Sequence, residues 1–301
     1  MGFFSKLFKK ESKDSSVRKR PNNPDVVDVS QGDDSMNWAI EKANLTLHHF
    51  ESCLKNPHES QFYFSIKVEI VDGNKNEHIW LTEPSFDKDG NLFGVVGNEP
   101  IDVTNVQMNQ KIGIDRKMIS DWMIIQNGRL IGGYTIRAIR DKLEGAALKN
   151  FDKGVGGMII DSGEDYFLPN DSTPEGVIVK LEQAYNNDNL EQALSCKDFN
   201  KEAEIMLLSK IGNPEIIKSD EGKSLLKTTA EALKLSYIKM LQENGMPKLK
   251  GVKRAFPIRE KITENHYKIT EYCFYPDGES TVDKLNVHKI NNSWKVVGGG
   301  E

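Results

Sequence analysis

The residues that could do chemistry begin with an acidic and an imidazole side chain next to each other, Glu77 and His78. A carboxylate beside an imidazole could act as a general acid, a general base or a pair of ligands. In a strand, however, neighbouring side chains point to opposite faces, so Glu77 would share a face with Ile79 and His78 with Trp80. The two are therefore not expected to share one metal ion or proton, and His78 could simply hydrogen-bond a backbone group beside a packed Trp80.

Four further candidates lie in the same half of the chain: Asp121, Trp122, Asn98 and Glu99. Asp121 stands where a strand is expected to begin, and an aspartate there commonly caps backbone N–H groups, although it could also serve a site. Trp122 is a candidate for the core or for the wall of a groove. Asn98 and Glu99 precede a proline, which predicts a rigid turn. They complete a polar pocket if they face the same sheet as Glu77, and otherwise they are turn residues only.

The stretch Ile119–Arg137 predicts a β-hairpin, because Asn127-Gly128 at its centre suits a two-residue turn. Gly132-Gly133 would then lie inside the second strand, where paired glycines indicate a bulge, a bend or a close approach of the backbone. Tyr134 and Arg137 would point to opposite faces of that strand. Arg137 is the best candidate for binding an anionic group, with an ordinary salt bridge as the alternative.

This hairpin, taken with Glu77-His78-Ile79-Trp80 and Gly97-Asn98-Glu99-Pro100, resembles the bacterial family known as domain of unknown function 2314, the YegJ-like proteins. The resemblance covers about residues 33–143. It implies a fold but no reaction, since the family has no established activity. The candidate pocket or motif residues are Glu77, His78, Trp80, Asn98, Glu99, Asp121, Trp122, Tyr134 and Arg137.

Residues 33–143 are expected to form a small α+β unit. Apolar residues recur every three or four positions between Met36 and Leu54, which predicts an amphipathic helix. We expect a strongly curved antiparallel or barrel-like sheet behind this helix, closed by the hairpin. Residues 144–173 contain many glycines and are expected to form an irregular connection between domains. The short strands expected before the hairpin are residues 62–70, 77–81, 92–96, 101–106 and 111–114.

The second half of the chain changes to helices first and antiparallel strands afterwards. Helices laid across a bent sheet form a cone-shaped α+β domain, expected at residues 174–298. The order of elements and the closing Trp294-Lys295-Val296-Val297 resemble the nuclear-transport-factor-2-like superfamily over about residues 175–298. Tyr267, Glu271, Tyr275 and Trp294 are candidate linings of a pocket at the mouth of the cone, but none of them matches a catalytic Asp/Tyr arrangement.

The charge of the chain is uneven. Residues 1–20 hold seven basic and two acidic side chains, a net charge of +5. Because the whole chain has a net charge of −5, residues 21–301 carry a net charge of −10. An acidic body argues against nucleic-acid binding, which needs a basic face. In residues 1–10, Phe3/Leu7 and Phe4/Phe8 are spaced as on an interfacial helix, so this tail, followed by a flexible linker to residue 32, could contact a membrane surface weakly or remain solvated.

The three cysteines, Cys53, Cys196 and Cys273, have no spacing that suits a zinc site or a redox pair, so no metal or other cofactor is expected. They are most simply buried thiols in a reducing compartment. No apolar run reaches the length of a membrane span, and the N-terminus lacks the apolar core of a signal peptide. The expected location is the cytoplasm.

These patterns favour a non-enzymatic binding or regulatory protein, with an immunity or stress role by analogy, because no complete catalytic constellation emerges. Its partner would be another protein or a small ligand, and the C-terminal sheet could form a homodimer. The alternative is a small-molecule hydrolase or isomerase. That alternative requires one pocket in the YegJ-like domain to gather Glu77, His78, Glu99, Asp121 and Arg137.

Overall fold

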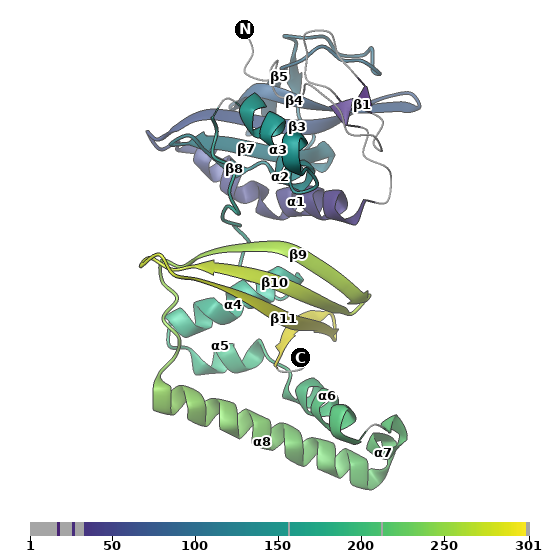
Figure 1. Ribbon diagram of the computed structural model, residues 1–301, viewed down its shortest axis with the longest axis vertical. Helices are drawn as coiled ribbons and strands as arrows, with labels where there is room; N and C mark the ends of the chain where they lie inside the picture. Colours follow the sequence, from purple (N-terminus) through teal and green to yellow (C-terminus); the bar gives the residue numbers. More distant parts are fainter. Residues whose placement is uncertain (1–16, 19–25, 28–32, 156, 212, 299–301) are drawn as a thin grey trace. The chain divides into compact units, whose positions relative to one another are not determined.

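The structure, a computed structural model, describes residues 17–18, 26–27, 33–155, 157–211 and 213–298 (Figure 1). The chain divides into two compact units between Tyr166 and Phe167. Ahead of the first helix, β1 (Val17–Arg18) pairs with β2 (Val26–Val27). The amphipathic tail predicted for residues 1–10 lies outside the described residues.

The first unit begins with helix α1 (Asp34–Lys55), as the apolar spacing predicts. Asp33 caps it, because its side chain accepts hydrogen bonds from the backbone N–H groups of Ser35 and Met36. Ala39, Ala43, Leu47 and Phe50 recur at helical spacing and are buried in the core. One face of α1 therefore packs on the sheet that follows.

That sheet is antiparallel and has the strand order β6-β5-β4-β3-β7-β8. It is open, so the barrel-like closure predicted from the sequence is wrong, while the α+β class with antiparallel sheets is confirmed. Residues 101–106 do not form the expected strand. The strands are β3 (Gln61–Asp72), β4 (Lys75–Phe86), β5 (Leu92–Val96), β6 (Lys111–Gly113), β7 (Ile119–Gln126) and β8 (Arg129–Gly132), with a short 3₁₀ helix η2 (Arg116–Met118) before β7.

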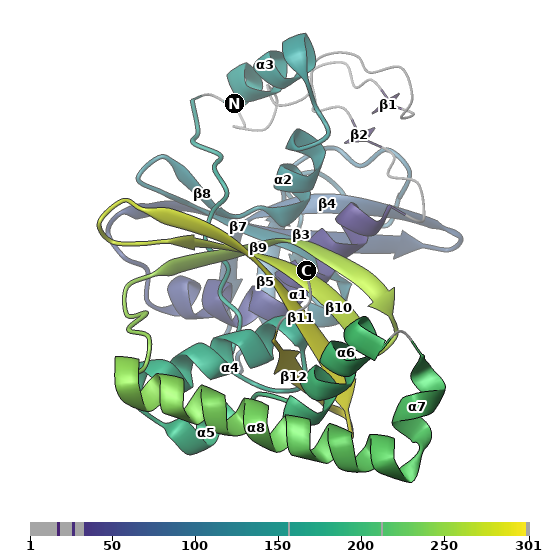
Figure 2. The same cartoon turned by 60° about the horizontal axis from the view of Figure 1, so that its bottom comes forward.

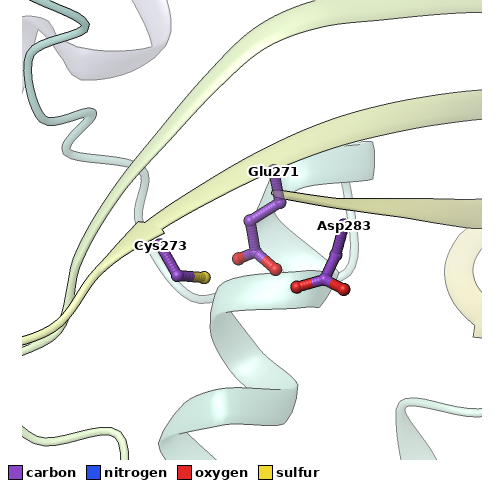
Figure 3. Close-up of side chains that lie close together, drawn as sticks. All are labelled: Glu271, Cys273 and Asp283. Atoms are coloured by element: carbon purple, nitrogen blue, oxygen red, sulfur yellow. The ribbon is translucent and has the colours of Figure 1, made fainter. Parts of the chain in front are cut away.

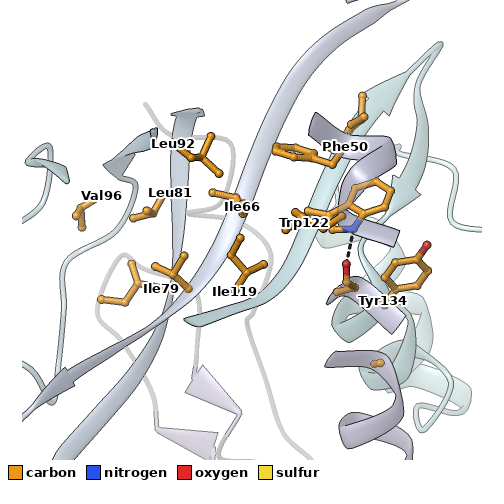
Figure 4. Close-up of a cluster of buried hydrophobic side chains, with 14 of the residues drawn as sticks. Phe50, Ile66, Ile79, Leu81, Leu92, Val96, Ile119, Trp122 and Tyr134 are labelled. Carbon is orange, nitrogen blue, oxygen red and sulfur yellow. Dashed lines mark hydrogen bonds between the residues drawn. The ribbon is translucent and has the colours of Figure 1, made fainter. Parts of the chain in front are cut away.

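The two faces of this sheet carry different cores, because side chains alternate along each strand. On one face, which we call the α1 face, Ile66, Ile79 and Trp122 pack with Phe50 of α1 (Figure 4). The opposite face, the α2 face, carries a smaller core. Its buried members are Met123, Ile125, Leu130, Ile136, Phe151 and Val155.

Two helices replace chain that the sequence predicts as strand or irregular. Helix α2 (Tyr134–Arg140) stands where the second hairpin strand was expected to continue, and α3 (Gly145–Gly154) lies in the expected irregular connection. The hairpin turn itself is confirmed, since Asn127 and Gly128 have φ of 48° and 74°. Gly132 and Gly133 have φ of 66° and 62°, which breaks the strand at once and starts the helix.

The second unit has helices first and strands afterwards, as predicted (Figure 2). Its sheet is antiparallel with the order β12-β11-β10-β9. Helix α4 contacts β10 and β12 on one face of this sheet, which we call the inner face. The elements are α4 (Pro174–Asn186), α5 (Leu190–Ser195), α6 (Phe199–Ile211), α7 (Pro214–Lys218), α8 (Asp220–Asn244), β9 (Lys253–Thr263), β10 (His266–Phe274), β11 (Ser280–Ile290) and β12 (Ser293–Val297).

Candidate functional site

Asp121 holds the start of helix α2. Its fully buried carboxylate accepts hydrogen bonds from the backbone N–H groups of Tyr134 (3.1 Å) and Thr135 (2.8 Å), from the Thr135 hydroxyl (2.6 Å) and from the N–H of Trp122 (2.8 Å). Burial raises the pKa of Asp121, and the hydrogen bond from Thr135 opposes that rise. Four donors leave this carboxylate little capacity for a substrate, so the geometry gives Asp121 a capping role.

The glycine pair brings α2 close to Trp122. A Cβ on Gly132 would lie 2.5 Å from the Trp122 ring and from its carbonyl oxygen, so no larger side chain fits without displacement. The Trp122 ring is fully buried, and its Nε1 donates to the carbonyl of Ala43 on α1 at 3.0 Å (Figure 4). Tyr134 stands edge-on to this ring at 5.7 Å. Trp122 and Tyr134 are thus part of the core, and nothing places them in a groove.

Arg137 lies on α2, so its predicted place on a strand face is wrong; Gly133 in the left-handed region and the Asp121 cap start the helix there. Its guanidinium donates to the backbone carbonyls of Gly132 (2.9 Å), Leu130 (2.6 Å) and Asp161. Its Nη1 is also 4.0 Å from the Asp161 carboxylate. The side chain that looked best suited to bind an anion therefore ties β8 and the chain near residue 161 together.

Glu77 and His78 point to opposite faces of β4, as predicted. Glu77 is buried, and its Oε2 accepts from the backbone N–H groups of Ile101 (2.8 Å) and Asp102 (3.0 Å). It therefore fixes the loop that follows Asn98 and Glu99. Within that turn the side-chain amide of Asn98 donates to the Glu99 carbonyl at 3.4 Å. This loop takes the place of the strand expected at residues 101–106, because the buried carboxylate and not a sheet partner receives its backbone N–H groups.

His78 belongs to a polar row across three strands on the α2 face. Its Nδ1 is 2.9 Å from the Oγ of Ser120, and Glu69 is its direct partner on β3. Lys67 faces both Trp80 and Asp121 in register, with its Nζ 5.8 Å from the centre of the Trp80 ring. Neither Lys67 nor Ser120 was among the candidate site residues predicted from the sequence.

Burial lowers the pKa of His78 to about 4, helped by the positive charge of Lys67. Burial also lowers the pKa of Lys67, while Asp121 opposes that change. The imidazole is therefore neutral near pH 7 and can accept or donate only a neutral hydrogen bond there. Ser120 lies at a β-bulge, between the pairs that Lys67 and Val68 make, and it is buried.

In the second unit the largest polar cluster joins α4 to the inner face of the sheet. Arg254 on β9 forms ion pairs with Glu182 of α4 and with Glu271 of β10, the latter at 2.9 Å. The three side chains are 9%, 14% and 8% exposed, respectively. Burial raises the pKa of Glu182 to about 9 against the opposing charge of Arg254, and the neighbouring Glu271 raises it further.

A second pair of the same kind lies two helical turns earlier on α4. Arg259 on β9 is 4.0 Å from the carboxylate of Glu175, which is fully buried, and its guanidinium lies 5.0 Å from the Tyr267 ring. Neither arginine nor either α4 glutamate was singled out from the sequence. The seven-residue spacing of Glu175 and Glu182 is the available signal, because it places two acidic residues on one side of a helix whose other buried members are apolar.

Of the predicted cone residues, Tyr267 and Trp294 lie together, with ring centroids 5.3 Å apart. Glu271 belongs to the Arg254 cluster. Tyr275 instead lies in the turn between β10 and β11, where its backbone pairs with Glu279 and Gly278. The four side chains are therefore not one pocket wall.

Glu271, Cys273 and Asp283 offer ligand atoms that all lie within 4.8 Å of one another (Figure 3). Such a group could hold a metal ion only with a deprotonated ligand set. Burial raises the pKa of Cys273 to about 11, and Arg254 already neutralises Glu271. The carboxylate of Glu271 is therefore placed to bind the Arg254 guanidinium and not a metal ion.

A family model matches the first unit of the chain. Residues 33–158 match the family model described as "Uncharacterized protein conserved in bacteria (DUF2314)". This match confirms the family expected from the hairpin motif. The uncharacterized protein YegJ of Escherichia coli (strain K12) is 41% identical over 73 residues, which are 24% of this chain and 47% of that protein.

A protein of Neisseria meningitidis serogroup B named "Putative ankyrin repeat protein" is 29% identical over 178 residues, which are 56% of this chain and 65% of that protein. The chain thus spans less than two thirds of the length of either curated relative. A crystal structure titled "Putative NTF2-like transpeptidase", from Campylobacter jejuni, matches 42% of this chain and 99% of its own chain, with 15% identity and a TM-score of 0.24. No helix in the described ranges is long and apolar enough to cross a membrane.

The DUF2314 segment does not bring together the five groups that a catalytic pocket was expected to gather. Glu77 binds loop N–H groups, His78 lies on the face opposite to it, and Asp121 caps α2. Arg137 binds backbone carbonyls of β8 and of Asp161. Most of the signature residues in this segment therefore position the backbone.

Proposed function

We propose that this chain is a non-catalytic binding protein of the bacterial cytoplasm that docks a second copy of itself on the outer face of its second sheet. The outer face is the face of β9, β10 and β11 that points away from α4. A regulatory role, in which dimer formation is the controlled step, follows from that assembly.

One observation carries this proposal: the outer face exposes large apolar side chains on β9 and β11, the two strands that flank β10. Ile258, Ile262 and Val282 are 55%, 47% and 61% exposed. Val282 is the direct cross-strand partner of Tyr272, and Tyr272 contacts Phe274 edge-on. Large apolar side chains exposed on one face of a sheet are characteristic of a protein interface.

Its charges favour a second copy over an unrelated partner. Glu260 on β9 pairs directly with Lys268 on β10, and Lys284 lies on β11 one row away. A two-fold interface brings each patch against itself, so a surface with both signs beside its apolar residues can complement its own copy.

The contacts in the first unit support the non-catalytic part. The carboxylates of Glu77 and Asp121 each accept from two or more backbone N–H groups, and the guanidinium of Arg137 is engaged with backbone carbonyls. All three cysteines are free thiols, which fits a reducing compartment.

Sedimentation velocity of the full chain from about 1 to 100 μM tests the proposal. The wild type is expected to sediment as a dimer at the upper concentrations, and Val282→Lys is expected to shift it to a monomer, since a buried charge in an interface core disfavours association. Leu235→Lys is the matched control, because Leu235 is 66% exposed but lies on α8. A wild type that stays monomeric throughout, or equal loss with both variants, would refute the proposal.

A further inference from the structure

Two histidines form a stacked pair at one corner of the second sheet. His266 on β10 and His288 on β11 are direct cross-strand partners, with ring centroids 3.9 Å apart and an interplanar angle of 22°. Nε2 of His266 is 3.1 Å from the Asn286 side-chain oxygen. Nε2 of His288 is buried and has no hydrogen-bond partner among the described residues. His288 is half-buried.

This corner is where the chain that leads into α6 joins the sheet. Lys197 bridges to Val296 in parallel, the N–H of Val296 donates to the Cys196 carbonyl at 2.8 Å, and the N–H of Asp198 donates to the Val296 carbonyl at 3.3 Å. The N–H of Gly298 also donates to Glu202 of α6 at 3.3 Å. Residues 196–198 thus extend the sheet beyond β12, which would otherwise present an open edge.

The charges around His288 come from three sides. Asp198, Lys201 and Glu204 act on it from the start of α6. Lys295 is the cross-strand partner of His288 on β12, and its Nζ donates to the Ser195 carbonyl at 2.6 Å. The ring of His266 stacks on the ring of His288. A proton on His288 would therefore stand beside the second imidazole and two lysines, with two carboxylates in partial compensation and no acceptor for its buried N–H.

We infer that the stacked pair His266–His288 is an acid-sensitive latch, which keeps residues 196–198 and the start of α6 on β12 near neutral pH and releases them when the pair is protonated. The released chain uncovers the edge of β12 and the thiol of Cys196, which is 1% exposed in the closed state. The pair lies on the outer face, next to the Lys268–Asn286 pair, but the inference rests on the contacts at β12 and not on dimer formation.

The sign of the pH dependence follows from His288. Burial and the neighbouring His266 lower the pKa of His288 to about 4 from its ordinary value of 6.5. The closed state therefore binds a proton more weakly than the released state, so acid favours release. For one such group the ratio of released to closed molecules is expected to rise about 30-fold between pH 8 and pH 5.

Thiol labelling of the full chain with 4,4′-dithiodipyridine measures this release. The rate at Cys196 is determined by mass spectrometry from pH 8 to pH 5 and divided by the rate in denaturant at the same pH, which removes the chemistry of the thiol itself. In the wild type the normalised rate at Cys196 should rise about 30-fold. Cys273, which is buried in the same sheet and away from α6, should stay protected.

Variants separate the latch from general acid unfolding. His288→Asn should make the normalised labelling rate at Cys196 independent of pH within about threefold. His266→Asn keeps the imidazole of His288 and should reduce the rise of that rate at low pH. His58→Asn, at an exposed histidine of the first unit, should behave as the wild type. A flat wild-type profile, or a rise at Cys273 equal to that at Cys196, would overturn the latch.

Discussion

Helices α2 and α4 both dock on a sheet through buried carboxylates, but the two dockings use different partners. Asp121 holds α2 through backbone N–H groups and one hydroxyl. Glu182 holds α4 through Arg254, which it shares with Glu271. Backbone donors cannot lose their protons and are fixed in direction, whereas a carboxyl pair around one guanidinium changes its charge with pH.

The two dockings also differ in how far apart their residues lie in the chain. A carboxylate that binds backbone N–H groups demands a local geometry, in this case a strand break at Gly132-Gly133 and a helix start, so its residues cluster in a short stretch. A shared arginine demands only that three long side chains meet, and they can come from distant positions. The predictions below test each half of that contrast.

The largest effect is expected from Gly132→Ala. The new Cβ would meet the Trp122 ring and carbonyl at 2.5 Å in a fully buried core, and α2 could not reach Asp121. We expect a loss of at least about 4 kcal/mol in the free energy of unfolding of the first unit. Denaturant titration with ¹⁹F NMR of 5-fluorotryptophan protein would resolve the Trp122 signal.

Gly73→Ala is the control for that experiment. Gly73 has a φ of 63°, close to that of Gly132, but no atom lies within 4 Å of its added Cβ. It should cost only about 1–2 kcal/mol for the left-handed backbone. Equal losses at both positions would mean that backbone conformation, and not the approach to Trp122, decides the effect.

Arg254→Met breaks the docking of α4. It leaves Glu271 and Glu182 buried without a cation, which is expected to cost the second unit about 3–5 kcal/mol. The Trp294 resonance reports on this unit. Lys261→Met, which removes an exposed ion pair to Glu264, should leave the stability of the second unit unchanged. If Arg254→Met leaves the stability of the second unit unchanged, α4 is held by packing alone.

Asp121→Asn tests the backbone docking of α2. The amide keeps the shape of the side chain but replaces an acceptor oxygen with a donor that faces N–H groups, so we expect a loss of about 2–3 kcal/mol. Asp115→Asn provides the contrast, because Asp115 caps the short helix η2 but is exposed, where asparagine caps nearly as well. Similar small losses in both would argue that the burial of Asp121 adds nothing to its cap.

The sequence predicted local structure well where neighbours along the chain decide it. The period of α1, the Asn127-Gly128 turn, the opposite faces of Glu77 and His78 and the helix-then-strand order of the second unit follow from spacing alone. The start of α2 could not be predicted in this way, because it depends on a carboxylate thirteen residues earlier.

The charged cluster of the second unit depends on still longer separations. Glu182, Arg254 and Glu271 lie on three different elements, and no local pattern links them. The histidine pair is similar, since His266 and His288 meet only through the register of β10 and β11. Contacts between side chains that are distant in the sequence cannot be predicted from residue spacing.

The finest test of the contrast is the pH dependence of the second unit. The pKa of Glu182 is raised to about 9, above the ordinary value of 4.5, so the folded state holds a proton that the unfolded state loses. Stability from this group is complete below about pH 4.5 and is lost as pH rises toward 9, with a slope of at most about 1.4 kcal/mol per pH unit. Glu182→Gln, which keeps a neutral side chain at all pH values, should flatten that slope for Trp294 and leave the Trp122 transition unchanged. If the slope persists in the variant, the proton resides elsewhere in the cluster, and Glu271 becomes the residue to replace.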